Sequence, residues 1–305
     1  MRRISTFTPW VAADVFSGHE PGASWDGSTI TTAQLYKTSG TTLDLVTRTF
    51  DEDGTPLSTV TQTITVASIN FYFQSTDPRL FYLSGASWYV DGTTAYTPIT
   101  TPYVDPGGVN ATCMSQPTVT GTYPNQKIYT IGGSGTTMAD VSWIARYDFT
   151  SGVPGLTPEA GNNVLGYNGA SGSFPPQVFG GDDGYIYVYS DHNAGWWKFD
   201  EDLNLIWGAV SGPGVVTGPA LTESGEKHCV ICNNTLITAR KTDPSDVIAI
   251  KQFQITADAV PWAQIGGLAS TLSGPVLPLG DGLAITSDGV FTTCTQDRRL
   301  LFTSL

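Results

Sequence analysis

Hydrophobic and polar positions alternate in short runs along the chain. No window of roughly 11–18 residues keeps an apolar stripe at the spacing of a helix. The runs are rich in Thr, Val, Ile, Tyr, Phe and Trp and end at Gly, Pro, Asp, Asn or Ser, which is typical of strands and turns. They predict strands over residues 34–37, 43–50, 58–66, 69–73, 185–190 and 290–295. The pattern therefore predicts an all-β protein.

One plan of strand, tight turn and strand returns along the chain. It is clearest in Gly180–Tyr189 followed by Trp196–Trp207, and the segment Cys294–Phe302 aligns without a gap on Phe199–Trp207. Weaker copies place anchor residues at 50, 147 and 253. If one further unit lies between the first two anchors, the spacing is about 40–55 residues, the length of a four-stranded propeller blade.

The best unit, Asp-Gly-Tyr-Ile-Tyr-Val followed by Trp-Lys-Phe-Asp-Glu-Asp-Leu-Asn-Leu-Ile-Trp, resembles the repeat of quinoprotein-type (PQQ-like) and related WD40-like β-propellers. The resemblance covers residues 174–210 and 274–305 well and residues 215–266 fairly. It implies a fold in which a tryptophan docks one blade on the next, a role expected of Trp207 and Trp262. It does not extend to a quinone site, because no matching ring of polar and cationic residues is present, and no cofactor is expected.

The predicted fold is one β-propeller of six, possibly seven, four-stranded blades over residues 1–305. The expected blades are residues 12–60, 61–108, 109–165, 166–212, 213–268 and 269–305. The alternative is an N-terminal β-sandwich of about 120 residues followed by a smaller β domain. The Thr/Ser-rich opening of the chain and the Pro-rich stretch Thr97–Gly108 favour that alternative.

Charge excludes two classes of partner. The formal net charge is −13, from 14 Lys+Arg against 27 Asp+Glu, which disfavours binding to nucleic acid or to an anionic membrane surface. No apolar stretch follows Arg2 and Arg3, so no signal peptide is expected, and no window is long and apolar enough for a membrane span. We therefore expect a cytoplasmic protein, or a virion protein if the chain is phage-encoded.

Cysteines and acidic turns give weak metal motifs. Cys229 and Cys232 lie three apart in a β-prone run, where side chains point to opposite faces, and no second ligand pair follows. They are interpreted as strand cysteines, with a reactive role left as the alternative. The segment Asp51–Gly54 lacks the ligand spacing of a calcium loop and is interpreted as a turn. No metal site is predicted.

The candidate binding residues lie in the loop between the second and third strands of the best repeat. Asp191, His192 and Asn193 place a carboxylate beside an imidazole, which fixes the tautomer of histidine and raises its basicity. A plain polar turn is the alternative. Trp196 joins this set, because tryptophans such as Trp25, Trp88 or Trp196 would form a carbohydrate or partner platform if they lay exposed.

Two functions follow. The first is a non-catalytic structural or binding propeller, in the style of a bacteriophage tail, fibre or head-decoration protein, whose partners are other subunits of an assembly or surface carbohydrate. The absence of catalytic motifs and the Thr-rich composition favour it. The second is a propeller lyase, lactonase or glycosidase with a metal or carboxylate/histidine site in the central channel. It predicts convergence of several among six residues, which are Asp140, Asp182, Asp191, His192, Asp246 and Asp288.

Overall fold

All regular structure in the described part of the chain is β-strand. The computed structural model describes residues 2–7, 22–25, 29–37, 41–51, 55–65, 72–74, 80–83, 87–90, 94–96, 112–113, 117–122, 124–133, 143–162, 177–181, 183–190, 195–209, 215–219, 228–232, 234–242, 247–257, 262–271, 283–285, 289–294 and 299–304. No helix occurs among these residues. The all-β prediction is confirmed, and each of the six predicted strands overlaps an observed one.

The strands of the first half of the chain form three antiparallel sheets. One has the order β2-β3-β4-β5, from Gly22–Trp25, Thr29–Lys37, Thr42–Asp51 and Pro56–Thr65. The next has the order β6-β7-β8-β9, from Tyr72–Gln74, Leu80–Leu83, Ser87–Val90 and Thr94–Tyr96. The third has the order β10-β12-β13-β14, with β11 also paired to β12, from Thr112–Cys113, Thr118–Thr122 (β11), Asn125–Gly133, Trp143–Thr150 and Val153–Asn162.

The second half repeats this arrangement. One sheet has the order β15-β16-β17-β18, with β19 paired to β17, from Gln177–Gly180, Ile186–Ser190, Gly195–Phe199, Leu205–Trp207 and Val216–Thr217 (β19). The next has the order β20-β21-β22-β23, from His228–Cys232, Thr235–Thr242, Val247–Gln254 and Gln264–Thr271. The last has the order β24-β25-β26-β1, from Leu283–Ile285, Gly289–Cys294, Arg299–Ser304 and Arg2–Phe7 (β1).

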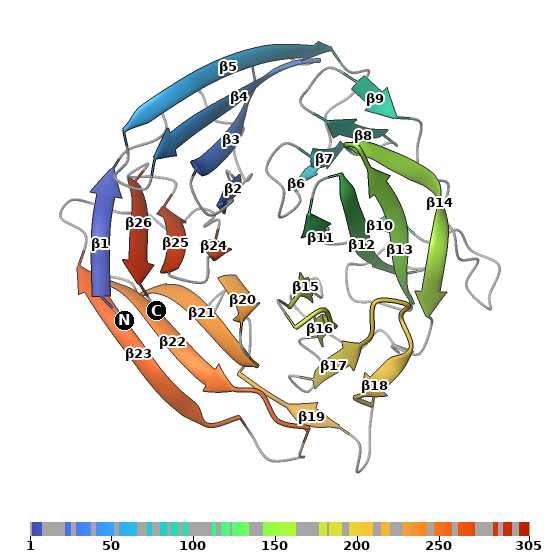
Figure 1. The fold of residues 1–305 in the computed structure, drawn as a ribbon, viewed down its shortest axis with the longest axis vertical. Helices are drawn as coiled ribbons and strands as arrows, with labels where there is room; N and C mark the ends of the chain where they lie inside the picture. The colour runs from blue at the N-terminus through green and yellow to red at the C-terminus, as the bar shows by residue number, and fades with distance from the viewer. Residues whose placement is uncertain are drawn as a thin grey trace. The chain divides into compact units, whose positions relative to one another are not determined.

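The chain divides into two compact units. Unit 1 comprises Met1–Pro98, Ala239–Lys251 and Gly267–Leu305, and unit 2 comprises Ile99–Thr238 and Gln252–Gly266. In unit 1 the N-terminal strand β1 pairs antiparallel with β26, so the first strand of the chain completes the last sheet (Figure 1). A self-contained N-terminal sandwich does not fit this pairing, because β1 belongs to a sheet of C-terminal strands.

Two details of the predicted repeat differ from the structure. Strand β5 runs on to Thr65, past the boundary expected at residue 60, and β1 lies outside the expected blades. The alignment of Cys294 on Phe199 is wrong by one strand: Phe199 ends the third strand of its sheet, whereas Cys294 ends the second strand of its own. Successive hairpins carry the same pattern of strand and turn, so the pattern alone does not distinguish a first hairpin from a second.

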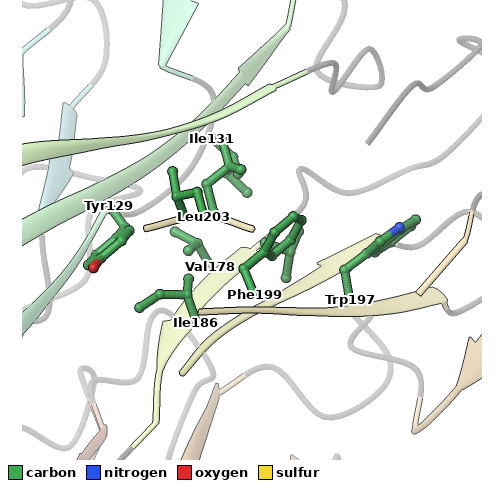
Figure 2. Close-up of a cluster of buried hydrophobic side chains, with 9 residues drawn as sticks. Tyr129, Ile131, Val178, Ile186, Trp197, Phe199 and Leu203 are labelled. Carbon is green, nitrogen blue, oxygen red and sulfur yellow. The ribbon is translucent and has the colours of Figure 1, made fainter. Parts of the chain in front are cut away.

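In unit 2 the sheets of β12–β13 and β15–β17 pack through one apolar cluster, which contains Tyr129, Ile131 and Ile144 from the first sheet (Figure 2). From the second sheet and its turn it contains Val178, Ile186, Val188, Trp197, Phe199 and Leu203. Each of these side chains is at most 5% exposed. Burial of this many large apolar side chains is the main force that holds the two sheets together.

Candidate functional site

The loop that carries Asp191, His192 and Asn193 connects the two strands of a well-buried hairpin. Strand β16 ends at Ser190 and β17 begins at Gly195, and these two residues pair across the base of the loop. The next pair, Tyr189 and Trp196, has both side chains 0% exposed. The three loop residues themselves lie outside the described residues, so their role stays a prediction. Their position on a fixed hairpin suits a binding or catalytic loop.

Trp196 is a packing residue. Its ring centroid lies 4.9 Å from that of Trp262, 5.1 Å from Tyr189 and 6.0 Å from Phe179. At 0% exposure it offers no surface to a ligand, so the expectation of an exposed platform at Trp196 is wrong. The side chains of Trp25 and Trp88 lie outside the described part of the structure.

Gly218 shows how closely the chain approaches this tryptophan. A Cβ atom at that position would lie 2.5 Å from Trp196 Nε1 and 2.9 Å from Trp262 Cε3. Glycine is therefore required there by contact with the two indole rings.

The inter-sheet role expected of Trp207 and Trp262 is confirmed. The two rings meet edge to face at 6.3 Å, and Trp262 is 5% exposed. Trp207 lies on β18, and Trp262, which is also in unit 2, comes just before β23 of another sheet. Aromatic pairs of this geometry add to the stability that burial alone provides.

A charged and aromatic cluster occupies the turn at the other end of β16. Asp183 Oδ2 accepts hydrogen bonds from Tyr187 Oη at 2.7 Å and from Lys198 Nζ at 2.9 Å, and Asp183 Oδ1 accepts one from the Tyr185 backbone at 3.1 Å. Lys198 Nζ also lies 3.9 Å from the centroid of the Tyr185 ring, a cation–π contact. Gly184, in the same turn, has a φ of +80°, as the Asp-Gly pattern predicts.

The Asp183 cluster stabilises the turn before β16. Burial raises the pKa of the Asp183 carboxyl group, but the hydrogen bonds from Tyr187 and Lys198 lower it more, so the pKa lies below its ordinary value. A carboxyl group that stays ionised at neutral pH does not serve as a general acid. Strand β16 spans five residues, roughly 16 Å, between this turn and the loop after Ser190, so the two features are separate.

A second charged network ties the same two sheets together. Lys127 Nζ lies 2.9 Å from both Asp148 Oδ1 and Glu159 Oε2. Arg146 contacts Glu159 at 3.3 Å and Asp202 at 2.7 Å, and it donates to the backbone carbonyl of Glu201. The hydrogen bond from Lys127 lowers the pKa of the Asp148 carboxyl group, so Asp148 also lacks a proton to donate at neutral pH.

Two aspartates close matching turns between the third and fourth strands of their sheets. Asp51 Oδ1 accepts the Thr55 backbone N–H at 2.7 Å, and Asp200 Oδ1 accepts the Asn204 N–H at 2.8 Å. In each turn the backbone N–H of the aspartate also donates to the carbonyl four residues on. The segment that begins at Asp51 therefore contains the strand-connecting turn that the sequence predicts.

Cys229 and Cys232 lie on strand β20, as expected, and their side chains lie outside the described set. Among the residues whose placement is described, no group of three or more His, Cys, Asp or Glu side chains is arranged to hold a metal ion. No helix in that same set is long and apolar enough to cross a membrane.

The six residues of the enzyme hypothesis lie outside the described residues, but the strand order sorts them by connection. Asp140, Asp191, His192 and Asp246 lie between the second and third strands of their sheets, whereas Asp182 and Asp288 lie between the first and second. In an antiparallel meander these two kinds of connection lie at opposite ends of the strands. The sequence alone did not separate the two groups.

Comparison with known proteins shows likeness at the level of fold. No protein-family model matches the chain, and no curated protein matches it. Its structure is similar to that of the neuraminidase-like protein of subtype N11 from A/flat-faced bat/Peru/033/2010 (H18N11), with a TM-score of 0.52 and 10% identity over 100% of this chain and 95% of that one.

Two weaker likenesses are to propeller proteins of other kinds. The GH43 endo-arabinanase from Bacillus licheniformis has a TM-score of 0.43 and 14% identity, over 98% of this chain and 97% of that one. The β-propeller domain of Cps50 (Swd1) from Myceliophteria thermophila has a TM-score of 0.41 and 11% identity, over 97% and 100%. Of the three likenesses, the one to the neuraminidase-like protein has a TM-score above 0.5, and it is a likeness of fold.

These likenesses correct the leading functional expectation. The expectation of a non-catalytic virion propeller is contradicted, because the fold that the chain matches with a TM-score of 0.52 is that of a neuraminidase-like protein. The resemblance to PQQ-like repeats holds only as a likeness of propeller fold, and nothing supports the phage assignment.

Proposed function

We propose that the chain is a propeller enzyme that hydrolyses glycosidic bonds, with Asp140, Asp191 and His192 at its active site. The observation that carries the proposal is topological: Asp140 and the Asp191–His192 pair lie on the same kind of connection in two sheets that pack face to face in unit 2. The fold-level likeness to a neuraminidase-like protein supports it.

Contacts between the two sheets support the proposal that the loop with Asp140 and the loop with Asp191 and His192 begin near the same end of the two sheets. Tyr129 on β12 donates a 3.0 Å hydrogen bond to the carbonyl of Glu201, just after β17. Gly133 lies four steps along β12 from Tyr129, and Phe199 lies four steps along β17 from Gly195, so each stretch is roughly 13 Å long. Ile131 lies between Tyr129 and its loop, and it belongs to the same apolar cluster as Trp197. Both loops therefore begin at a similar distance, measured along the strands, from the contact between Tyr129 and Glu201.

Glycoside hydrolysis needs two carboxyl groups, one to protonate the leaving oxygen and one to act as base or nucleophile. Asp140 and Asp191 supply such a pair, and His192 beside Asp191 adds a group that exchanges protons near neutral pH. Asp183 and Asp148 do not suit the proton-donating role, because their pKa values lie below the ordinary range. The net charge of −13 disfavours anionic substrates, so we expect a neutral glycan.

We further infer that the six sheets are six blades of one propeller domain spanning residues 1–305. The pairing of β1 with β26 supports it, since that pairing supplies the C-terminal sheet with a fourth strand from the N-terminus. An experimental structure of the whole chain tests this assignment. A ring of six four-stranded sheets is expected, and two separately folded domains would contradict it.

The function is tested with chromogenic aryl arabinosides, xylosides and sialosides. We expect hydrolysis of a neutral glycoside, and at least about a hundredfold loss of kcat in D140N and D191N, as for removal of a general acid or base. E201Q is the matched control, because Glu201 is exposed and lies at the opposite end of β17 from the loop. No turnover of any glycoside, or wild-type turnover by D140N and D191N, would overturn the proposal.

A further inference from the structure

Strand β5 is an edge strand that lacks the usual protection against pairing with another chain. It runs ten residues, Pro56–Thr65, and among the described strands it pairs with β4 alone, at one end of its sheet (Figure 1). Residues 56–61, 63 and 65 are exposed. An edge strand presents backbone N–H and C=O groups that are ready to extend the sheet. We propose that β5 pairs antiparallel with β5 of a second copy of this chain.

Most other edges of the described sheets are guarded. The first strand of each sheet is only two to five residues long, and two of the fourth strands, β9 and β18, have three residues each. Strand β14 is as long as β5 but carries Pro154, Pro158 and Glu159, and β1 carries Arg2 and Arg3. Strand β23 has eight residues with neither charge nor proline, but it contains the pair Gly266–Gly267, which weakens a strand. Short length, proline and charge are the devices that block edge pairing, and β5 has only a proline at its first residue.

Charge favours a copy of the same strand as the occupant. Strand β5 contains no charged residue, although the chain as a whole carries a net charge of −13. Like charges directly opposite each other destabilise a pair of strands. Two copies that meet along β5 place no such charges opposite each other. Leu57 and Val60 are also 57% and 50% exposed on this strand, so pairing would remove apolar surface from water.

Symmetry fixes which side chains would face each other. A two-fold axis perpendicular to the extended sheet keeps each face of one copy continuous with the same face of the other. Residues of the same parity then pair, because side chains alternate between faces. Of the two registers that use nine of the ten residues, the one that excludes Pro56 places Thr61 opposite Thr61 of the second copy and Thr59 opposite Thr63. Cross-strand threonine pairs are favourable in antiparallel sheets.

The test is sedimentation of the full chain over a range of concentrations, at low and high salt. We expect a monomer–dimer equilibrium that strengthens with salt, because salt screens repulsion between two chains of charge −13. V60K and T61K introduce an ammonium group along the pairing edge, and each should weaken the dimer at least about tenfold. V153K is the matched control, since Val153 on the proline-protected β14 is 49% exposed against 50% for Val60.

Thermal unfolding followed by circular dichroism checks that the variants fold, and hydrogen exchange locates the interface. Added protection of amides in residues 56–65 on dimerisation supports the proposal. A chain that stays monomeric at every concentration would overturn it, as would a dimer that V60K and T61K leave unchanged. Glycosidase activity plays no part in this readout, so the dimer and the proposed function succeed or fail separately.

Discussion

Asp183 Oδ2 and Lys198 Nζ, from residues 15 positions apart, form a 2.9 Å ion pair that locks the turn before β16 onto the strand after the candidate loop. The Lys198 side chain is 12% exposed and the Asp183 side chain 23%, so this pair is better shielded from water than the Arg146–Asp202 pair, where Asp202 is 66% exposed. The pair bridges both strands of the β16–β17 hairpin. It therefore stabilises the hairpin that carries the candidate loop, at the end of the hairpin opposite that loop.

D183N should lower the free energy of unfolding by about 2 kcal/mol, because it leaves the largely shielded ammonium group of Lys198 without its counter-charge. D202N, which breaks an exposed ion pair, should cost less than about 1 kcal/mol. Urea unfolding of both variants beside the wild type measures the difference. Equal losses in the two variants would contradict the role given to burial.

Stability should fall in acid through a small set of carboxyl groups. The folded-state pKa values of Asp183, Asp148 and Asp200 are all lowered. A lowered pKa contributes stability that is fully present above the unfolded value of about 4 and is lost as pH falls through the folded value.

Urea midpoints measured from pH 7 down to pH 2 should therefore stay level to about pH 4–5 and then drop. In D183N the drop should be shallower, and the gap between D183N and the wild type should narrow below about pH 4. A gap of constant size across this range would show that the Asp183 carboxylate contributes nothing through its ionised state.

Trp196 should prove important for stability and neutral for ligand binding. W196A removes the 0% exposed ring at the centre of the aromatic group and should cost about 3–5 kcal/mol in unfolding free energy. W196F should cost less, because it keeps a ring and removes an indole N–H that has no partner among the described residues. Urea unfolding gives the costs, and titration of W196F with glycan should match the wild type. A specific loss of glycan affinity in folded W196F would contradict a purely structural role.

The strands of this protein could be predicted because they depend on local pattern. Tyr185–Tyr189 alternates within a β-branched and aromatic run, and β16 lies there. The glycine of Asp183–Gly184 supplies the positive φ that its turn requires. Trp207 and Trp262 could be assigned to inter-sheet packing because their places in the repeat put them at sheet boundaries.

Whether the Trp196 ring is buried or exposed was decided only by the tertiary structure. Its local sequence is equally compatible with an exposed ring and a buried one, and contacts with Trp262, 66 residues away, put it in the core. The same holds for the candidate catalytic residues. Their spacing in sequence shows no motif, and only the strand order places Asp140 and Asp191 on the same kind of connection.

By itself, then, the sequence determined the all-β class, the positions of strands and turns, and the acidic charge, since each is a property of neighbouring residues or of composition. Only the tertiary structure decided that β1 completes the sheet of β24–β26, that Asp183 is paired with Lys198, and that β5 is the last strand of its sheet. These features join residues far apart in the chain, and no local pattern encodes which distant partner a strand or side chain will meet.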